Sequence, residues 1–121
     1  MKTVLLVDDE APIRANLKRF LELEGFRVLE AQNGAEGLAL AIQNVADLII
    51  CDVMMPEMNG FEMLARLRSS LEWQEVPFLF LSASAEADAR QHGIALGAED
   101  YMTKPFNLME VIARVRSRLG M

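Results

Sequence analysis

Five polar side chains each stand where a short apolar stretch of the chain ends. Three of them are acids, Asp8, Asp9 and Asp52, and the others are the hydroxyl of Ser82 and the ammonium of Lys104. Clustered carboxylates bind divalent cations, and a carboxylate can also act as a nucleophile. If the fold brings the acids, the hydroxyl and the ammonium together, they have the composition of an active site.

The apolar stretches predict the strands that would position these side chains. They cover residues 4–7, 48–51 and 78–81, and a shorter one covers 101–103. Continuous runs of Val, Ile, Leu and Phe bounded by polar residues are typical of strands buried on both faces of a parallel sheet. Ligands of such sheets bind beyond the carboxyl ends of the strands. The acids, the hydroxyl and the ammonium are therefore expected at one edge of the sheet.

Segments with helical period separate the expected strands. Residues 27–30 predict a further short strand, and a fourth helix is expected over 86–96, capped by Ser84 and ended by Gly97. The positions expected to face the core are Ile13, Leu17, Phe20 and Leu21 in the first helix, Leu38, Ala41 and Ile42 in the second, Phe61, Leu64 and Leu67 in the third, and Val111, Ile112, Val115 and Leu119 in the last. Five alternations of strand and helix, with right-handed crossovers, predict a doubly wound α/β sheet.

The composition indicates one cytoplasmic domain. The 121 residues carry a formal net charge of −6 with acids and bases interspersed, so no basic stripe is present to bind nucleic acid directly. Cys51 is the single cysteine, which excludes an internal disulfide, and its apolar neighbours make it a core thiol. No apolar stretch approaches the roughly 20 residues of a membrane span, and the N-terminal segment is too short for a signal peptide.

Four pieces of the sequence resemble the receiver domain of two-component response regulators. They are VLLVDDE, DLIICDVMMPEMNG, FLFLSA and GAEDYMTKPF, in this order, and the resemblance covers essentially the whole chain. It implies a single domain over residues 1–121 with a flavodoxin-like (βα)5 fold, a five-stranded parallel sheet of strand order 2-1-3-4-5. It also implies a phosphorylation-activated switch that takes its phosphoryl group from a sensor histidine kinase. Such a domain is no enzyme beyond catalysing its own phosphorylation and dephosphorylation.

The resemblance assigns the phosphoryl acceptor and the metal ligands. Asp52 would be the acceptor, and Asp8 and Asp9 with Asp52 and the backbone carbonyl of Met54 would hold Mg²⁺. The residues agree physically, since carboxylates ~5 Å apart repel by ~3 kcal/mol per pair at an effective dielectric near 20, so that the cluster needs a cation. The acids, Glu10 among them, can at the same time interact favourably with the dipole of the helix that follows.

The remaining roles of the family fall on three further side chains. Lys104 would bind the phosphate, before a cis peptide to Pro105, and the Ser82 hydroxyl would move to the phosphate oxygen. Tyr101 would rotate inward when that hydroxyl moves, although a half-buried tyrosine at the sheet edge is the alternative. Met54 supplies no side chain to orient an attacking water, so we expect a long-lived phosphoryl group.

A group of charged residues resembles the surface through which receivers of winged-helix transcription regulators form two-fold dimers. The group is Arg90, Glu99, Asp100, Glu110 and Arg114. Pairs such as Arg90 with Glu110 and Asp100 with Arg114 would join two copies after phosphorylation. The alternative is a solvated surface of salt bridges, each worth little.

Other functions are compatible with parts of this pattern. A phosphatase of the haloacid dehalogenase type also uses Asp, Mg²⁺, Ser and Lys, but its D-x-D follows the first strand, where this chain has adjacent acids. A flavodoxin-like FMN carrier would need a phosphate loop rich in Ser, Thr and Gly after the first strand. A degenerate receiver would act by binding alone. An effector domain in a longer regulator or a separate target protein would receive the signal.

Overall fold

Five strands and five helices alternate in the computed structural model, which describes residues 1–70, 75–84 and 86–121. The strands are β1 (Thr3–Val7), β2 (Arg27–Ala31), β3 (Leu48–Asp52), β4 (Phe78–Ser82) and β5 (Asp100–Thr103). The helices are α1 (Ala11–Leu23), α2 (Gly34–Gln43), α3 (Gly60–Arg68), α4 (Ala87–Ala95) and α5 (Leu108–Arg118). The predicted (βα)5 order is confirmed, with each strand one residue longer than its expected range.

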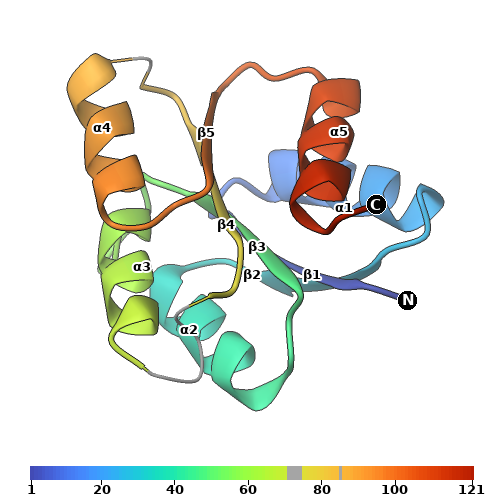
Figure 1. Ribbon diagram of the computed structural model, residues 1–121, viewed down its shortest axis with the longest axis horizontal. Helices are drawn as coiled ribbons and strands as arrows, with labels where there is room; N and C mark the ends of the chain where they lie inside the picture. Colours follow the sequence, from blue (N-terminus) through green and yellow to red (C-terminus); the bar gives the residue numbers. More distant parts are fainter. Residues whose placement is uncertain (71–74, 85) are drawn as a thin grey trace.

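The strands form one parallel sheet in the order β2-β1-β3-β4-β5, as predicted (Figure 1). The chain winds outward from β1 to β2 and then in the opposite direction from β3 to β5. In doubly wound sheets such a reversal marks the place where ligands bind, here at the carboxyl ends of β1 and β3. Val7 pairs with Cys51 in the register of these two strands, so Asp8 and Asp52 follow as neighbours at this edge.

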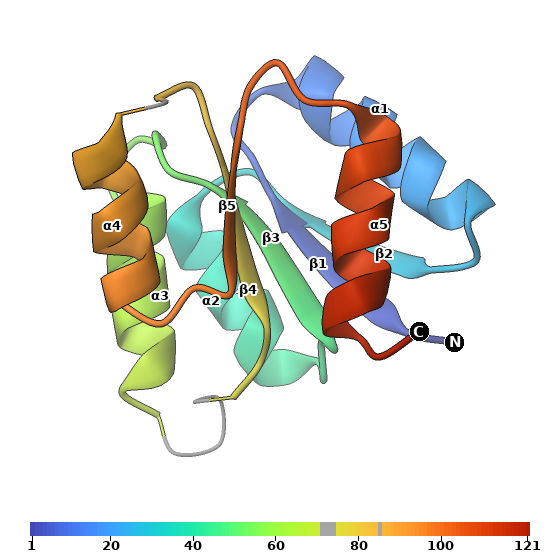
Figure 2. The ribbon, with the colours of Figure 1, turned by 45° about the horizontal axis from the view of Figure 1, so that its top comes forward.

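Helices cover both faces of the sheet. α1 and α5 lie on one face and α2, α3 and α4 on the other (Figure 2). Alternate residues of β1 pack into the two layers, Leu5 and Val7 beneath α2 and α3, Val4 and Leu6 beneath α1 and α5. The continuous apolar runs are thus explained by burial on both faces. None of the described helices is long and apolar enough to cross a membrane.

The prediction that Ile42 faces the core is wrong. Its side chain is 60% exposed, and α2 packs on the sheet through Gly34, Gly37 and Ala41 instead. A Cβ atom on Gly37 would lie 2.8 Å from Cγ2 of Val7, so α2 can pack this closely on β1 only because position 37 has no side chain. This close approach turns the neighbouring Ile42 towards solvent, which the apolar pattern alone does not indicate.

The start of α4 also differs from the prediction. Glu86 is the N-cap residue and makes no side-chain cap hydrogen bond, whereas Ser84 Oγ accepts one from the Glu86 N–H at 3.3 Å, ahead of the helix. Within α4 itself Gly93 is the one buried residue, and a Cβ atom there would lie 3.0 Å from the Phe80 ring. Little apolar surface therefore ties α4 to the sheet.

Candidate functional site

The carboxyl ends of β1, β3 and β5 gather four carboxylates around one ammonium. Asp8, Asp9, Glu10 and Asp52 each offer an oxygen, and these oxygens lie within 4.8 Å of one another. The Lys104 Nζ is 3.1 Å from Asp8 Oδ2, 3.3 Å from Asp52 Oδ2 and 2.8 Å from Glu10 Oε1. The acids and the lysine that were predicted to meet at this edge do meet there.

Sequence reasoning missed Glu10 as a partner of Lys104. The two residues are 94 positions apart, and the location of Glu10 before α1 indicated only an interaction with the helix dipole. Its carboxylate in fact makes no cap hydrogen bond to α1 and reaches across to the lysine. The one available signal was its place at the end of the first strand, beside Asp8 and Asp9.

Burial sets the electrostatics of the acceptor candidate. Asp52 is 3% exposed, and this burial together with the charge of Asp8 raises the pKa of Asp52 to about 6, against the opposing effect of Lys104. Burial lowers the pKa of Lys104, but the hydrogen bond to Glu10 and the charges of Asp52 and Asp8 outweigh it, so that this pKa is raised overall. Near neutral pH the site holds an ionised aspartate and a protonated lysine.

The backbone before α1 is held by side chains from two elements. Asp8 Oδ1 accepts a hydrogen bond from the Glu10 N–H at 2.8 Å, and Arg14 Nη1 donates to the carbonyl of Asp8 at 2.7 Å. Arg14 Nε also donates to Glu30 Oε1 on β2 at 3.3 Å. These contacts fix the direction in which the Asp8 carboxylate points.

The start of α3 fits tightly against the end of β3. A Cβ atom on Gly60 would lie 2.3 Å from the carbonyl oxygen of Asp52, a distance that only glycine allows. A capping box between Asn59 and Glu62 begins the helix at this point, with mutual hydrogen bonds of 2.9 and 3.2 Å. α3 therefore positions the backbone of Asp52.

The donor set fits Mg²⁺. The three acids predicted as ligands offer hard carboxylate oxygens, two of them buried (Asp8 and Asp52) and one exposed (Asp9), which suits an ion that keeps several waters. Met54, two residues beyond the acceptor, exposes 70% of its surface, and its thioether side chain adds no polar group beside Asp52. Its carbonyl as a further ligand remains a prediction.

Ser82 and Tyr101 meet at one backbone segment. Ser82 is fully buried at the end of β4, beside the end of β3, and its Oγ accepts a hydrogen bond from the Ser84 N–H at 3.0 Å. The hydroxyl of Tyr101 donates to the Ser84 carbonyl at 2.9 Å, and the tyrosine is 1% exposed. The ring thus points inward, and one residue links the hydroxyl at the site to the aromatic on β5.

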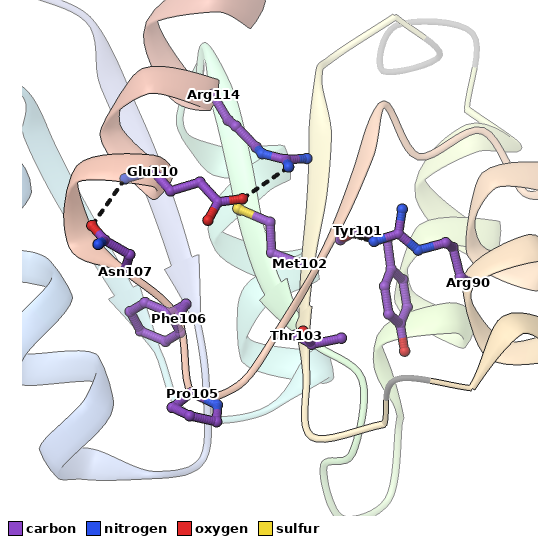
Figure 3. Close-up of a pocket in the computed structure, with 9 residues that line it drawn as sticks. All are labelled: Arg90, Tyr101, Met102, Thr103, Pro105, Phe106, Asn107, Glu110 and Arg114. Carbon is purple, nitrogen blue, oxygen red and sulfur yellow. Dashed lines mark hydrogen bonds and ion pairs between the residues drawn. The ribbon is translucent and has the colours of Figure 1, made fainter.

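A groove of about 260 Å³ lies between α4 and α5, with β5 as its floor (Figure 3). Arg90 reaches over its α4 side, where the guanidinium carbon stands 5.7 Å from the Tyr101 ring centroid and Nη2 donates to the Tyr101 carbonyl at 2.9 Å. On the α5 side Arg114 donates to Glu110 Oε1 at 2.9 Å and also pairs with Asp100. The charged residues that were predicted to join two copies have partners within one chain here.

Glu99 is engaged at the other end of β5. Its carboxylate accepts hydrogen bonds from the Phe78 N–H and from Arg68 Nη2, the latter at 3.2 and 3.3 Å. These contacts connect the residue before β5 to the start of β4 and to α3. A role for Glu99 between two copies stays a prediction, and it would compete with this intrachain pairing.

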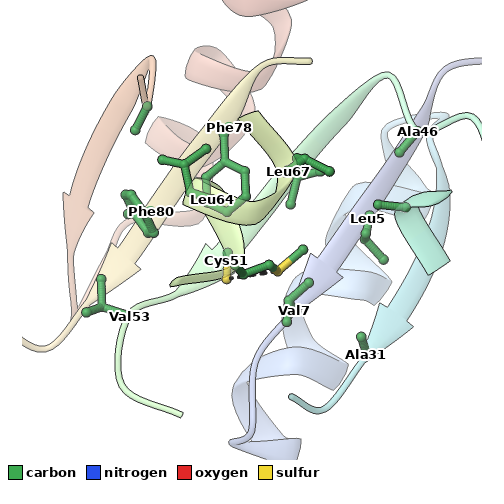
Figure 4. Close-up of a cluster of buried hydrophobic side chains, with 14 of the residues drawn as sticks. Leu5, Val7, Ala31, Ala46, Cys51, Val53, Leu64, Leu67, Phe78 and Phe80 are labelled. Atoms are coloured by element: carbon green, nitrogen blue, oxygen red, sulfur yellow. Dashed lines mark hydrogen bonds between the residues drawn. The ribbon is translucent and has the colours of Figure 1, made fainter. Parts of the chain in front are cut away.

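Cys51 is a core thiol, as predicted. It is fully buried beneath α3, and its Sγ lies 3.1 Å from the carbonyl oxygen of Asp52 and 3.9 Å from Met63 Sδ (Figure 4). Burial first, and then the charges of Asp52 and Asp8, raise the pKa of the Cys51 thiol well above its usual range. The thiol therefore stays protonated and belongs to the packing under the acceptor.

Comparison with known proteins places this geometry in a family. Residues 4–116 match the model of the response regulator receiver domain. The chain is 40% identical over 118 residues to the phosphate regulon transcriptional regulatory protein PhoB of Pseudomonas aeruginosa, and 42% identical over 116 residues to the transcriptional regulatory protein SrrA of Staphylococcus aureus. These alignments cover 98% and 96% of this chain but 52% and 47% of those proteins, so the chain spans about half their length.

Solved structures agree with the sequence comparison. The chemotaxis protein CheY4 of Vibrio cholerae superposes with a TM-score of 0.92 at 35% identity, over 97% of this chain and 98% of that one. The Francisella response regulator 1452 receiver domain gives a TM-score of 0.93 at 33% identity, over 99% and 98%. The fold and the cluster of acids at the carboxyl ends of the strands define a class of doubly wound α/β protein. The chain belongs to the receiver domains of two-component response regulators.

Proposed function

We propose that this receiver domain accepts a phosphoryl group from a sensor histidine kinase on Asp52, in a Mg²⁺-dependent reaction. The observation that supports it most directly is the setting of Asp52. Its carboxylate is buried at the end of β3 and lies 3.3 Å from the Lys104 ammonium, inside a cluster of hard oxygen donors. Asp8 has the same neighbours, but its second oxygen already accepts the Glu10 N–H at 2.8 Å, and the family resemblance assigns the acceptor role to Asp52.

The proposed step transfers one phosphoryl group and needs no other reactant. An Asp52 carboxylate oxygen attacks the phosphorus of the kinase phosphohistidine, an O–P bond forms, and the N–P bond breaks. The pair of electrons of the broken bond stays on the imidazole nitrogen, which takes up a proton. Mg²⁺, when bound, would neutralise the charge on the phosphoryl oxygens. Lys104 and the Ser82 hydroxyl would hold two of these oxygens, so the domain catalyses its own phosphorylation and dephosphorylation.

The same side chains would transmit the phosphorylated state to the surface. Ser82 Oγ holds the Ser84 N–H while Tyr101 holds the Ser84 carbonyl, so a Ser82 hydroxyl that turns to a phosphate oxygen disturbs both contacts. The weak attachment of α4 permits the rearrangement. A swing from 1:99 to 99:1 takes about 5.5 kcal/mol, which two charge-assisted contacts and a metal bridge can supply.

The output face would be α4, β5 and α5. The curated relatives are named as transcriptional regulators. For this chain we propose that either an effector domain or a separate target protein receives the signal. We also propose a phosphorylation-dependent homodimer. In such a dimer Arg90 of one copy would pair with Glu110 of the other, and Asp100 with Arg114. Arg114 already pairs with Asp100 and Glu110 within one chain, so dimerisation replaces these ion pairs with ion pairs between copies. The free energy gained is then only the difference between the two sets of pairs. Our expectation of a cytoplasmic location belongs to this proposal.

Intact-mass measurement with acetyl phosphate and Mg²⁺ tests the acceptor directly. We expect the wild-type protein to gain one phosphoryl group and the Asp52→Asn variant to gain none. The same incubation with a chelator in place of Mg²⁺ should leave the wild type unmodified. A folded wild-type protein that gains no mass would contradict the proposal and indicate a degenerate receiver that acts by binding alone.

A further inference from the structure

Carboxylate oxygens surround the Lys104 ammonium, which a phosphoryl group would have to share with them. An ammonium has three N–H donors, and the three nearest acceptors are carboxylate oxygens of Glu10, Asp8 and Asp52, at 2.8, 3.1 and 3.3 Å. The lysine side chain is 10% exposed, so solvent offers it little choice of other partners. A phosphoryl oxygen that binds Lys104 therefore competes with these carboxylates for the ammonium.

The three carboxylates differ in how easily they can leave. Asp52 would carry the phosphoryl group itself. Asp8 is buried, and its other oxygen is held by the Glu10 N–H at 2.8 Å. The Glu10 side chain is 53% exposed, and Lys104 is its one side-chain partner among the described residues. Water can replace this contact at low cost, whereas Asp8 and Asp52 are buried at the site.

We propose that Glu10 is a displaceable partner of Lys104, which holds the ammonium at the site until a phosphoryl oxygen replaces it, and which thereby lowers the affinity of the site for the phosphoryl group. The inference rests on the proposed function, with Asp52 as the acceptor. Glu10 acts as a positioning residue through Lys104. It also places a negative charge where a phosphoryl group would approach, so two effects of the same sign oppose phosphorylation.

The test compares the binding of beryllofluoride, a non-covalent analogue of the phosphoryl group on an aspartate, at saturating Mg²⁺. The Glu10→Gln variant keeps the size of the side chain and removes its charge. We expect it to bind beryllofluoride about threefold to fivefold more tightly than the wild type, the size expected of one half-exposed ion pair. The matched control is Glu22→Gln, an exposed glutamate about 18 Å further along α1 at 1.5 Å per residue, which should leave the affinity unchanged.

Urea unfolding separates this role from a structural one. If Glu10 acted only on the helix dipole, loss of its charge near the start of α1 would destabilise the protein equally with and without beryllofluoride. Such an effect would leave the affinity for beryllofluoride unchanged. A displaceable contact instead stabilises only the free protein. We expect Glu10 and Lys104→Gln to show coupling in a double-mutant cycle of unfolding without beryllofluoride. The difference in stability between wild type and Glu10→Gln should become smaller when both are saturated with beryllofluoride.

The possible outcomes are distinct. Equal or weaker beryllofluoride binding by Glu10→Gln, with normal binding by the wild type, overturns the inference and leaves the proposed function intact. Equal destabilisation of the free and the loaded variant also overturns it, since Glu10 would then be structural. If the wild type neither binds beryllofluoride nor gains a phosphoryl group from acetyl phosphate, the proposed function fails and the inference with it.

Discussion

At the scale of single residues, Asp52 ionises in surroundings that disfavour its charge. An aspartate in an unfolded chain has a pKa near 3.9, whereas burial and the charge of Asp8 raise the pKa of Asp52 to about 6. The raised pKa means that the folded protein binds this proton more tightly than the unfolded chain. Its contribution to stability is therefore fully present below about pH 4 and is lost as the pH rises through about 6.

The Asp52→Asn variant should be more stable than the wild type at pH 8 in the absence of Mg²⁺. The linkage of about two pKa units corresponds to roughly 3 kcal/mol, and the lost contact with Lys104 reduces the expected gain to about 1–2 kcal/mol. Urea unfolding at pH 4, 6 and 8 in the presence of a chelator measures it. The gain should shrink towards pH 4, and a gain that grows as the pH falls would contradict the assigned sign.

Asp9 should matter for the metal and little for the fold. It is exposed, so Asp9→Asn is expected to change the unfolding free energy of the metal-free protein by less than about 0.5 kcal/mol. Mg²⁺ at ten times its dissociation constant should stabilise the wild type by about 1.4 kcal/mol and the variant much less. Thermal unfolding with and without Mg²⁺ measures this, with the exposed Asp88→Asn of α4 as the control. An equal response of both variants would remove Asp9 from the ligand set.

At the scale of elements, the junction between β3 and α3 sets the position of the acceptor. The Asp52 carbonyl occupies the space that a side chain at position 60 would need, and the Asn59 capping box fixes where the helix begins. The start of α3 and the end of β3 therefore move as one unit. A second junction, at Ser84, joins β4 to the tyrosine of β5.

Gly60→Ala should damage both the fold and phosphorylation. The new Cβ atom would meet a backbone oxygen at 2.3 Å, so α3 or the Asp52 backbone must shift. We expect a loss of about 2 kcal/mol or more in unfolding free energy and at least about a tenfold slower reaction with acetyl phosphate. The control is Ala65→Gly, exposed on the same helix, which should cost about 1 kcal/mol and leave the reaction unchanged. A Gly60→Ala variant with normal kinetics would show that the junction is not rigid.

At the scale of the whole molecule, the predicted dimer places the same surface of two copies face to face across a two-fold axis. Positive side chains of one copy must then lie opposite negative side chains of the other. Arg90 and Glu110 line opposite sides of the groove, and no ion pair joins them within the described part of the chain. They can pair between copies once Arg90 leaves the Tyr101 carbonyl and Glu110 leaves Arg114.

A charge exchange tests this dimer. We expect the protein loaded with beryllofluoride to be a dimer by light scattering, and Arg90→Glu to weaken that dimer about tenfold or more, since like charges would then face each other. The double variant Arg90→Glu with Glu110→Arg should restore it. If the loaded wild type remains a monomer at high concentration, the output face contacts another protein or domain instead.

The sequence by itself determined the elements and most of the site. Runs such as 48–51 are apolar throughout because both faces of a parallel strand are buried, and the polar residue that ends each run must lie at the ligand-binding edge. These two facts predict a doubly wound parallel sheet and the meeting of Asp8, Asp9, Asp52 and Lys104, whereas the strand order was implied by the family resemblance. They depend only on local pattern and on the few topologies that right-handed crossovers allow.

Only the tertiary structure decided which partners these groups choose. Glu10 and Lys104 are distant in sequence, and their contact follows from the geometry of two strand ends. The outward turn of Ile42 follows from the glycine contact of α2 with β1. Arg114 pairs with Asp100 and Glu110 within one chain, whereas the sequence alone is equally compatible with pairs between two copies. Pattern predicts which face of an element is buried, but the pairing of long charged side chains and the closeness of two packed backbones depend on distances that exist only after folding.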